Sequence, residues 1–217
     1  MSEWWTYSLT DFLLFSPRTY SRLFALYNEA VWPAHLAALA LAPALPWLAR
    51  TEYGGRPTAA LLAGIWAWVA WAFHAERYAT INWAATYFAI AFAAQAALLL
   101  WSALGPSHVA PRANGAARAA LAVFAFAAFI QPFAGLAFGR NLNQAELFGL
   151  APDPTAVATI ALLALAPRTP WHLLIIPALW CVVTGLTLTA MQAPDALLTP
   201  LAGALALFLA AWKTRAA

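Results

Sequence analysis

Charge is the scarcest property of this sequence. Only 9% of its 217 residues are Asp, Glu, Lys or Arg, whereas a typical soluble domain carries about 25%. Hydrophobic residues make up 64% of the chain. So few charged side chains cannot cover a surface that faces water. The composition therefore excludes an ordinary soluble domain and predicts a membrane protein.

Several chemical signatures are missing as well. Cys181 is the single cysteine, so no disulfide can form within the chain. No basic run of the kind that binds nucleic acid is present. The sequence also lacks a phosphate-binding glycine loop, a His-Glu-x-x-His zinc helix and a Gly-x-Ser-x-Gly elbow, and no Lys lies in the core of an apolar run where a retinal Schiff base would form. We therefore expect no nucleic-acid partner, and no enzyme class follows from a motif.

Seven apolar runs are present, and Trp or Tyr flanks several of them as in an aromatic belt. A membrane-spanning helix needs roughly 17–25 mostly apolar residues. The predicted fold is therefore an all-α polytopic membrane helical bundle with seven transmembrane helices, or six if the short fifth run is re-entrant. No internal repeat or linker divides residues 31–217, which we expect to form one domain. The runs cover approximately residues 31–49, 58–75, 82–102, 117–139, 154–167, 171–190 and 196–212.

Residues 1–30 form a separate element in this prediction. Ser16-Pro17 is a helix start, because a hydroxyl caps the helix and Pro fits its first position. Aromatic and aliphatic residues then recur at helical spacing, which favours an amphipathic helix in the membrane interface. Pro33 would kink it into the first span, and Trp4-Trp5 would rest at the lipid headgroups. The apolar positions are Tyr20, Phe24, Tyr27 and Val31.

The ends of the runs carry an uneven distribution of charge. Four Lys or Arg fall on the side of the N-terminus and seven on the other, so the positive-inside rule places the N-terminus outside and the C-terminus in the cytoplasm. Seven of the eight acidic residues fall on the outer side, and only Glu52 lies on the other. A negative outer face attracts cations. The alternative is that the acids merely cap helices or avoid the cytoplasmic surface.

Ionisable and polar side chains near the outer ends of the runs are the candidate site. A membrane-buried ionisable residue is a functional hypothesis by default, and together these groups predict an outward-open polar funnel. Competing structural roles exist: Asp153-Pro154 and Pro194-Asp195 are typical helix starts, and Glu146 could pair with Arg140. The predicted substrate-binding residues are His35, His74, Glu76, Tyr87, Gln131, Glu146 and Asp153.

Three classes of function remain open at this stage. The leading hypothesis is transport or binding of a cation or small polar solute. The second is a metal-dependent intramembrane lipid hydrolase, in which His35, His74 and Glu146 would bind a divalent metal such as Zn²⁺. The third is electron transfer through haems held by the four histidines, or a structural subunit of a membrane complex. The remaining histidines of that third hypothesis are His108 and His172.

Three segments carry a resemblance to a known family. They are Glu146-Leu-Phe-Gly-Leu-Ala-Pro-Asp-Pro-Thr155, Trp180-Cys181 and Met191-Gln-Ala-Pro-Asp195, with Trp4-Trp5 and Asp11-Phe-Leu-Leu-Phe-Ser-Pro17 upstream. The chain resembles a family of bacterial multi-pass membrane proteins that is defined only as a domain of unknown function. This resemblance implies a location in the bacterial inner membrane among lipids, and it leaves a homo-oligomer or a membrane-complex partner open. It implies no activity and no cofactor.

Overall fold

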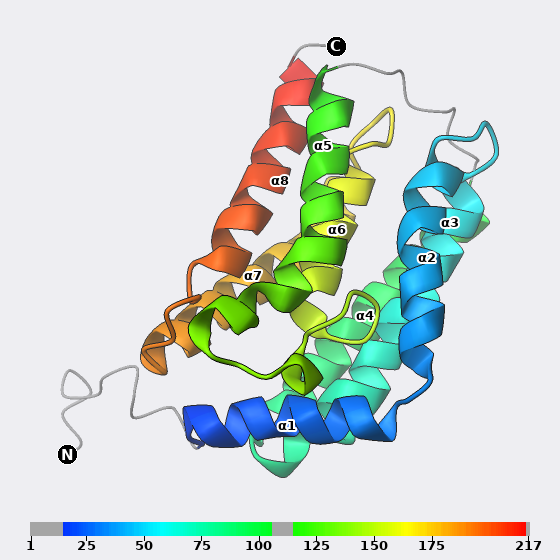
Figure 1. Ribbon diagram of the computed structural model, residues 1–217. Coiled ribbons are helices and arrows are strands. Elements are labelled where there is room, and N and C mark those ends of the chain that lie inside the picture. Colours follow the sequence, from blue (N-terminus) through cyan, green and yellow to red (C-terminus); the bar gives the residue numbers. More distant parts are fainter. Residues whose placement is uncertain (1–14, 106–114, 216–217) are drawn as a thin grey trace, which may run out of the picture.

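The computed structural model describes residues 15–105 and 115–215, which form helices joined by loops and contain no β-strand (Figure 1). The segment Trp4-Trp5 and Asp11 lie outside the described residues. Eight α-helices are present in the described part of the chain. They are α1 (Pro17–Ala30), α2 (Ala34–Ala49), α3 (Gly55–Trp68), α4 (Ala85–Leu104), α5 (Gly115–Ala125), α6 (Pro152–Leu163), α7 (Trp171–Ala190) and α8 (Leu198–Arg215).

Shorter π- and 3₁₀-helical segments extend or connect the α-helices. α3 continues into a π-helix, and α5 continues first into a π-helix and then into a 3₁₀-helix. These segments are η3 (Val69–Ala75), η4 (Tyr78–Thr80), η5 (Phe126–Ile130), η6 (Gln131–Phe138) and η7 (Leu142–Gln144).

The helix α1 lies across one end of the bundle, and its axis makes an angle of 94° with that of α2. Its predicted start is confirmed, because the Ser16 side chain accepts a hydrogen bond from the Thr19 backbone N–H at 3.1 Å. Its aromatic face packs against the bundle: Phe24 stacks on Phe73 at 5.2 Å between ring centroids. The apolar side of this amphipathic helix therefore packs against protein. Its position at a membrane interface stays a prediction.

Four helical segments are long and apolar enough to cross a membrane, with a fifth if the bent pair α1–α2 counts as one span. They are Gly55–Thr80, Ala85–Leu104, Gly115–Phe138 and Trp171–Ala190. Seven crossings are therefore not confirmed. The fifth predicted run corresponds to α6, whose 12 residues extend for about 18 Å at 1.5 Å per residue, short of the roughly 30 Å of a bilayer core.

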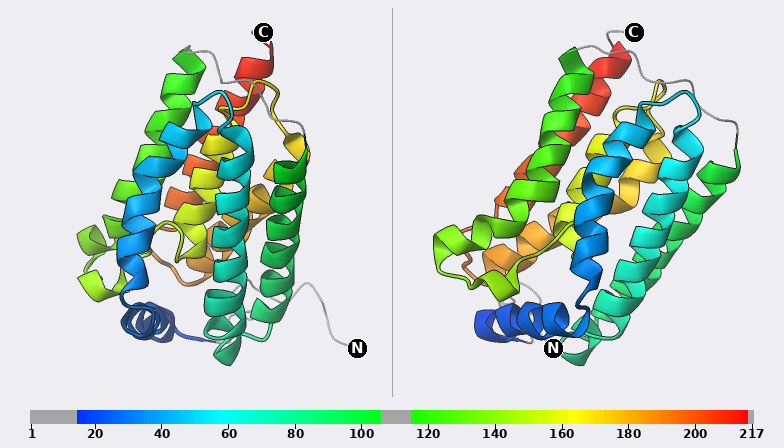
Figure 2. Two further views of the ribbon diagram at one scale, coloured as in Figure 1. Left: turned by 90° about the vertical axis from the view of Figure 1, so that its right-hand side faces the viewer. Right: turned by 45° about the vertical axis from the view of Figure 1, so that its right-hand side comes forward.

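The short helix α6 lies at the centre of the bundle and packs against α5, α7 and α8 (Figure 2). Its residues are buried on all sides from Pro152 to Leu162, as expected of a helix that is apolar around its whole circumference. Past its C-terminal end, the Lys213 ammonium donates to the carbonyls of Ala164, Leu165 and Ala166. α7 and α8 approach so closely that a Cβ added to Gly185 would lie 2.9 Å from Pro200 Cγ.

The break between α5 and α6 follows from Pro132 and two glycines. Proline lacks the N–H that a continuing α-helix needs, and the chain passes from π- to 3₁₀-helix at Gln131. Gly139, with a φ of 83°, ends η6, and Gly149 is again left-handed, with a φ of 84°. Irregular backbone at membrane depth is tolerated where protein surrounds it or where it lines a cavity. The segment 139–151 forms such a connection and leads into the first turn of α6.

The connections that carry most of the acidic residues lie at one end of the bundle. The α1–α2 corner, the α3–α4 turn, η6 with its following loop, and the α7–α8 connection share this end in each view (Figures 1 and 2). Glu29, Glu76, Glu146 and Asp195 belong to these elements, and Asp153 lies in the first turn of α6 just above them.

Candidate functional site

Asp153 is a buried carboxylate that is held by three hydrogen bonds. The side chain lies in the first turn of α6, and the residue is only 4% exposed. Its Oδ1 accepts from Trp180 Nε1 and from Thr184 Oγ1, each at 2.8 Å, and Oδ2 accepts from Thr199 Oγ1 at 3.2 Å. The helix N-terminus adds a favourable dipole. These contacts offset part of the cost of burying the carboxyl group inside the protein.

The predicted capping role of Asp153 is wrong. The N-cap of α6 is Ala151, no side chain caps this helix, and Asp153 follows Pro152 inside the first turn. The carboxylate instead reaches donors on α7 and α8. Trp180 and Thr184 are four residues apart on α7, so they share a face of that helix and both point at Asp153.

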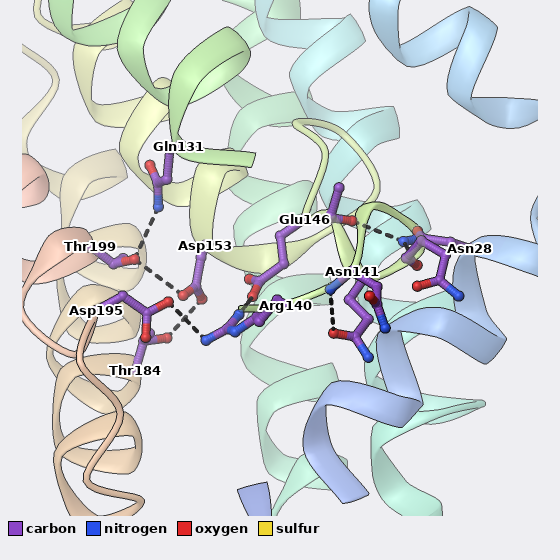
Figure 3. A network of polar contacts seen from close by, with 12 residues as sticks. Asn28, Gln131, Arg140, Asn141, Glu146, Asp153, Thr184, Asp195 and Thr199 are labelled. Carbon is purple, nitrogen blue, oxygen red and sulfur yellow. Dashed lines mark hydrogen bonds and ion pairs between the residues drawn. The ribbon is translucent and has the colours of Figure 1, made fainter. Parts of the chain in front are cut away.

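The Arg140 guanidinium bridges two further carboxylates (Figure 3). Its Nη1 lies 2.9 Å from Glu146 Oε1 and its Nη2 lies 2.8 Å from Asp195 Oδ2. The side chains are 18% exposed for Arg140, 15% for Glu146 and 9% for Asp195. The predicted Arg140–Glu146 ion pair is therefore confirmed, and Asp195 is a second partner rather than only a helix start.

We call Arg140, Glu146, Asp153 and Asp195 the carboxylate cluster. Three carboxylates and one guanidinium would carry a formal charge of two negative units if all were ionised. Burial and the charge of Asp153 raise the pKa of Glu146 to about 8, although Arg140 opposes both effects. Burial lowers the pKa of Arg140, but Glu146 and Asp195 outweigh that effect and leave it raised.

The 2.9 Å contact with Arg140 and the high pKa of Glu146 are compatible. Arg140 donates to Glu146 Oε1, and a carboxyl group that carries its proton on the other oxygen can still accept that hydrogen bond. One guanidinium cannot neutralise three carboxylates, so a proton on Glu146 lowers the repulsion within the cluster. Arg140 alone therefore leaves the cluster short of positive charge, and a proton or a bound cation would reduce that deficit.

A small cavity of about 30 Å³ adjoins the cluster. Its lining comes from η6, the 139–151 segment, the start of α6 and the region where α7 passes into α8. A cavity needs at least roughly 10–15 Å³ to hold one water molecule, so this one holds about two molecules of that size. Four of the polar lining residues are Gln131, Glu146, Asp195 and Thr199.

Two polar atoms of the cavity lining have no hydrogen-bond partner among the described residues: Gln131 Oε1 and Asp195 Oδ1. The orientation of the Gln131 amide follows from its neighbour. Thr199 donates its hydroxyl hydrogen to Asp153, so it accepts from Gln131 Nε2 at 3.0 Å. Both unpaired atoms are therefore hydrogen-bond acceptors, and what fits between them is a donor.

The family of the chain follows from residues 18–217, which match the model of a family of unknown function, DUF6064. The chain belongs to DUF6064. This match confirms the resemblance to a family of unknown function, and it starts in α1 and includes every residue of the carboxylate cluster. No curated protein and no solved structure matches the chain significantly. The chemistry of this DUF6064 protein must therefore be derived from its own side chains.

Three of the seven predicted substrate-binding residues, Gln131, Glu146 and Asp153, meet at the cavity. His35 lies elsewhere, in the first turn of α2, where its Nε2 is 3.3 Å from Asn28 Oδ1. The Asn28 amide in turn donates to the backbone carbonyls of Asn143 and Ala145, at 2.8 and 2.9 Å. His35 thus supports, through Asn28, the loop that carries Glu146.

His74 is fully buried in η3 and is enclosed by aromatic rings. The nearest ring centroids are those of Phe92 at 4.4 Å and Trp180 at 4.9 Å, and neither imidazole nitrogen has a hydrogen-bond partner in the described part of the chain. Glu76 is exposed, and Tyr87 is 63% exposed on α4. These three residues do not line the cavity, and the α4 side of the predicted funnel does not form.

The predicted metal site does not assemble either. Within residues 15–105 and 115–215, no three His, Cys, Asp or Glu side chains are placed to hold a metal ion. His35 contacts Asn28, His74 lies among aromatic rings, and Glu146 pairs with Arg140, so the proposed ligands are held apart. Of the histidines in the haem hypothesis, His172 is exposed at the start of α7, and His108 lies outside the described residues.

Sequence reasoning missed the partners of Asp153 rather than Asp153 itself. Trp180 and Thr199 did not stand out, because an indole and a hydroxyl in an apolar run are usually structural. The available signal was spacing: Trp180 and Thr184 recur one helical turn apart in the same apolar run.

Proposed function

We propose that this DUF6064 protein is a membrane transport protein that binds a small hydrogen-bond-donating cation, ammonium or a protonated amine of similar size, in the cavity beside the carboxylate cluster. The observation that carries the proposal is the lining of unpaired acceptors. Gln131 Oε1 and Asp195 Oδ1 need donors, and the surrounding cluster has more carboxylates than cationic side chains.

Charge selects the sign of the ligand. An ionised group in the interior is costly unless it is paired, and Arg140 is shared between Glu146 and Asp195. Asp153 is stabilised by three neutral donors and a helix N-terminus, which leave its charge uncompensated by a cation. A bound anion would add to the repulsion, whereas a monovalent cation would reduce it.

Size selects the kind of cation. The cavity volume of about 30 Å³ admits a ligand comparable with one or two water molecules, which excludes sugars, nucleotides and lipid headgroups. The described residues provide no cluster of three metal-binding side chains. An ammonium ion fits these conditions, because it is about the size of water and its N–H groups can donate to separate acceptors.

The position of the cavity supports transport. It lies where the helix that begins with α5 breaks off and where α6 begins inside the bundle. Ion and substrate sites of membrane transporters lie at discontinuous helices of this kind, with a helix end facing the ligand. In this proposal the helices make seven crossings of a bacterial inner membrane, with the N-terminus outside and the cavity near that face.

Binding is tested by titration calorimetry of the purified full chain in lipid nanodiscs with ammonium chloride, methylammonium chloride, sodium chloride and potassium chloride at fixed ionic strength. We expect heat from the two nitrogen cations and at least about tenfold weaker binding in Asp195→Asn, which removes a negative charge, and in Gln131→Met, which removes an acceptor, each worth about 1.5 kcal/mol or more. Glu76→Gln is the matched control, because it neutralises an exposed carboxylate at the same end.

Transport is tested by uptake of labelled methylammonium into proteoliposomes. Uptake above that of empty liposomes, reduced in Asp195→Asn and retained in Glu76→Gln, supports the proposal. Equal affinity in all variants, or no heat from any nitrogen cation, contradicts the binding site. Binding without uptake contradicts the transport role.

A further inference from the structure

The three carboxylates of the cluster differ in what supports their negative charge. Asp153 accepts three hydrogen bonds from neutral donors. Asp195 bonds to Arg140 through Oδ2 and lines the cavity. Glu146 has Arg140 as its ion-pair partner, and it shares that partner with Asp195. Glu146 and Asp195 therefore depend on one shared guanidinium, and a proton on one of these two carboxylates lowers the charge that Arg140 must compensate.

The charged and titratable groups around Glu146 come from four elements. Arg140 follows η6, Asp195 lies between α7 and α8, Asp153 begins α6, and Tyr20 projects from α1. Asp153 and Asp195 both disfavour a charge on Glu146, and Arg140 alone favours it. The Tyr20 phenol is buried, and Glu146 raises its pKa, so Tyr20 stays neutral and adds no charge.

We infer that the cavity exchanges its cation for a proton and that Glu146 is the group that carries this proton. The inference rests on the proposed function and specifies how the site is loaded. With the cavity free of a cation, Glu146 holds a proton and the cluster contains two carboxylates. With an ammonium ion bound, Glu146 is ionised and its charge is compensated by the ligand.

The exchange balances in charge and atoms. A protonated Glu146 and an ammonium ion from solution give an ionised Glu146 with bound ammonium, and one proton is released to solution. No covalent bond forms other than that of the leaving proton to water, and Arg140 keeps its charge throughout. The net charge of the cluster with its ligand is the same before and after the exchange, which avoids the cost of an extra charge in the interior.

Local geometry allows Glu146 to lose and regain a proton without a large movement. Arg140 donates to Glu146 Oε1 at 2.9 Å in either state. The backbone is fixed, because Glu146 N–H donates to the Pro132 carbonyl at 3.3 Å and Asn28 holds the carbonyl of Ala145. Burial and the charge of Asp153 raise the pKa of Glu146 to about 8, which places the exchange within the physiological range of pH.

The decisive experiment counts protons. Wild-type protein in nanodiscs is titrated with ammonium chloride at pH 7 in phosphate and in Tris, two buffers with different enthalpies of ionisation. The slope of the binding enthalpy against buffer enthalpy gives the number of protons released. We expect about one proton per cation, and an affinity that increases with pH up to about 8 and then levels off.

Glu146→Gln and Glu76→Gln are the paired variants. Glu146→Gln preserves the neutral form, so it should bind ammonium more weakly than the wild type does at pH 8, without proton release and with little dependence of affinity on pH. Glu76→Gln should behave as wild type. Cation binding without proton release in the wild type, or release that persists in Glu146→Gln, would overturn the inference and leave the binding site intact. No binding by the wild type would remove the proposed function itself.

An infrared measurement covers the case in which Glu146→Gln does not fold. Difference spectra of the wild-type protein with and without ammonium chloride report protonated carboxyl groups directly. Loss of a protonated-carboxyl band on ammonium binding supports the exchange. A spectrum without such a loss, recorded on protein that binds ammonium, contradicts it.

Discussion

Two buried polar groups that touch the same indole have opposite environments. Trp180 donates its Nε1–H to Asp153 and packs its ring system against His74 at 4.9 Å. Asp153 accepts two more hydrogen bonds, from Thr184 and Thr199. His74 packs against aromatic rings, among them Phe92 and Trp180, and both of its ring nitrogens lack partners in the described part of the chain.

The surroundings of Asp153, which we call the charged region, therefore accommodate a polar group through hydrogen bonds, whereas the surroundings of His74 are packed rings. A buried carboxylate needs hydrogen-bond donors or a cation, and the chain brings donors to Asp153 from α7 and α8. An imidazole among phenyl and indole rings contributes mainly buried area and ring contacts. Both residues are ionisable groups buried in a bundle of apolar helices, where a functional role is the usual expectation, yet only Asp153 has the surroundings of a site.

The largest effect is expected from Asp153→Ala. This change leaves Trp180 Nε1 and the hydroxyls of Thr184 and Thr199 without their common acceptor. Each unsatisfied buried donor costs about 1–3 kcal/mol, so we expect a loss of at least about 3 kcal/mol, measured by unfolding in detergent micelles. Asp153→Asn keeps one acceptor and should lose less. A loss below about 1 kcal/mol in Asp153→Ala would show that the hydrogen bonds to this carboxylate contribute little to the stability of the fold.

Arg140→Gln tests the same region through its cation. Glu146 and Asp195 then remain buried without an ion-pair partner, which costs about 3 kcal/mol near neutral pH. The pKa of Glu146 is already raised and rises further when Arg140 is absent. The folded protein then binds more protons than the unfolded chain, so the stability of Arg140→Gln should recover as pH falls from about 8 to 5.

The control for that variant is the double change Arg140→Gln with Glu146→Gln. It removes one cation and one carboxylate together, so its stability at pH 8 should exceed that of Arg140→Gln alone. Melting curves at pH 5 and pH 8 make the comparison. An Arg140→Gln protein whose stability does not change with pH would mean that the carboxylates are not the source of its instability.

The sequence identified some polar residues of the cavity, but it did not predict which distant residues they contact. Gln131, Glu146 and Asp153 were found because amide and carboxyl groups in an apolar chain need partners or water. Thr199 and Asp195 act on residues 46 and 55 positions away, and no local spacing predicts such contacts. The capping interpretation of Asp153 failed for the same reason, because donors from α7 and α8 outcompete a local hydrogen bond.

His74 was misplaced because sequence spacing assumes a regular α-helix. The π-helical segment η3 changes the number of residues per turn, which alters the direction in which His74 points relative to the regular part of α3. The apolar runs predicted the positions of α2 to α8 closely, since long apolar runs specify helices well. They do not establish the number of crossings, because α6 is short and is buried in protein along most of its length.

His74→Phe is expected to have a smaller effect than either change in the charged region. Phenylalanine keeps a ring against Phe92 and Trp180 and removes two unsatisfied nitrogens, so stability should stay within about 1 kcal/mol of wild type or rise. His74→Ala, which leaves a cavity, should cost about 2–4 kcal/mol. Weaker ammonium binding by a stable His74→Phe protein would show that the imidazole belongs to the functional site.

The smallest effect is expected from Tyr87→Phe, and its value lies in the contrast with Thr199→Val. Both changes remove one hydroxyl, but Tyr87 is 63% exposed and Thr199 is 3% exposed. Thr199 also links Gln131 to Asp153, so Thr199→Val should cost about 1–2 kcal/mol and weaken ammonium binding in the calorimeter. Tyr87→Phe should change stability by less than about 0.5 kcal/mol and leave binding unchanged. If it weakens binding instead, the site extends to α4, and the separation between the charged region and the rest of the predicted pocket is wrong.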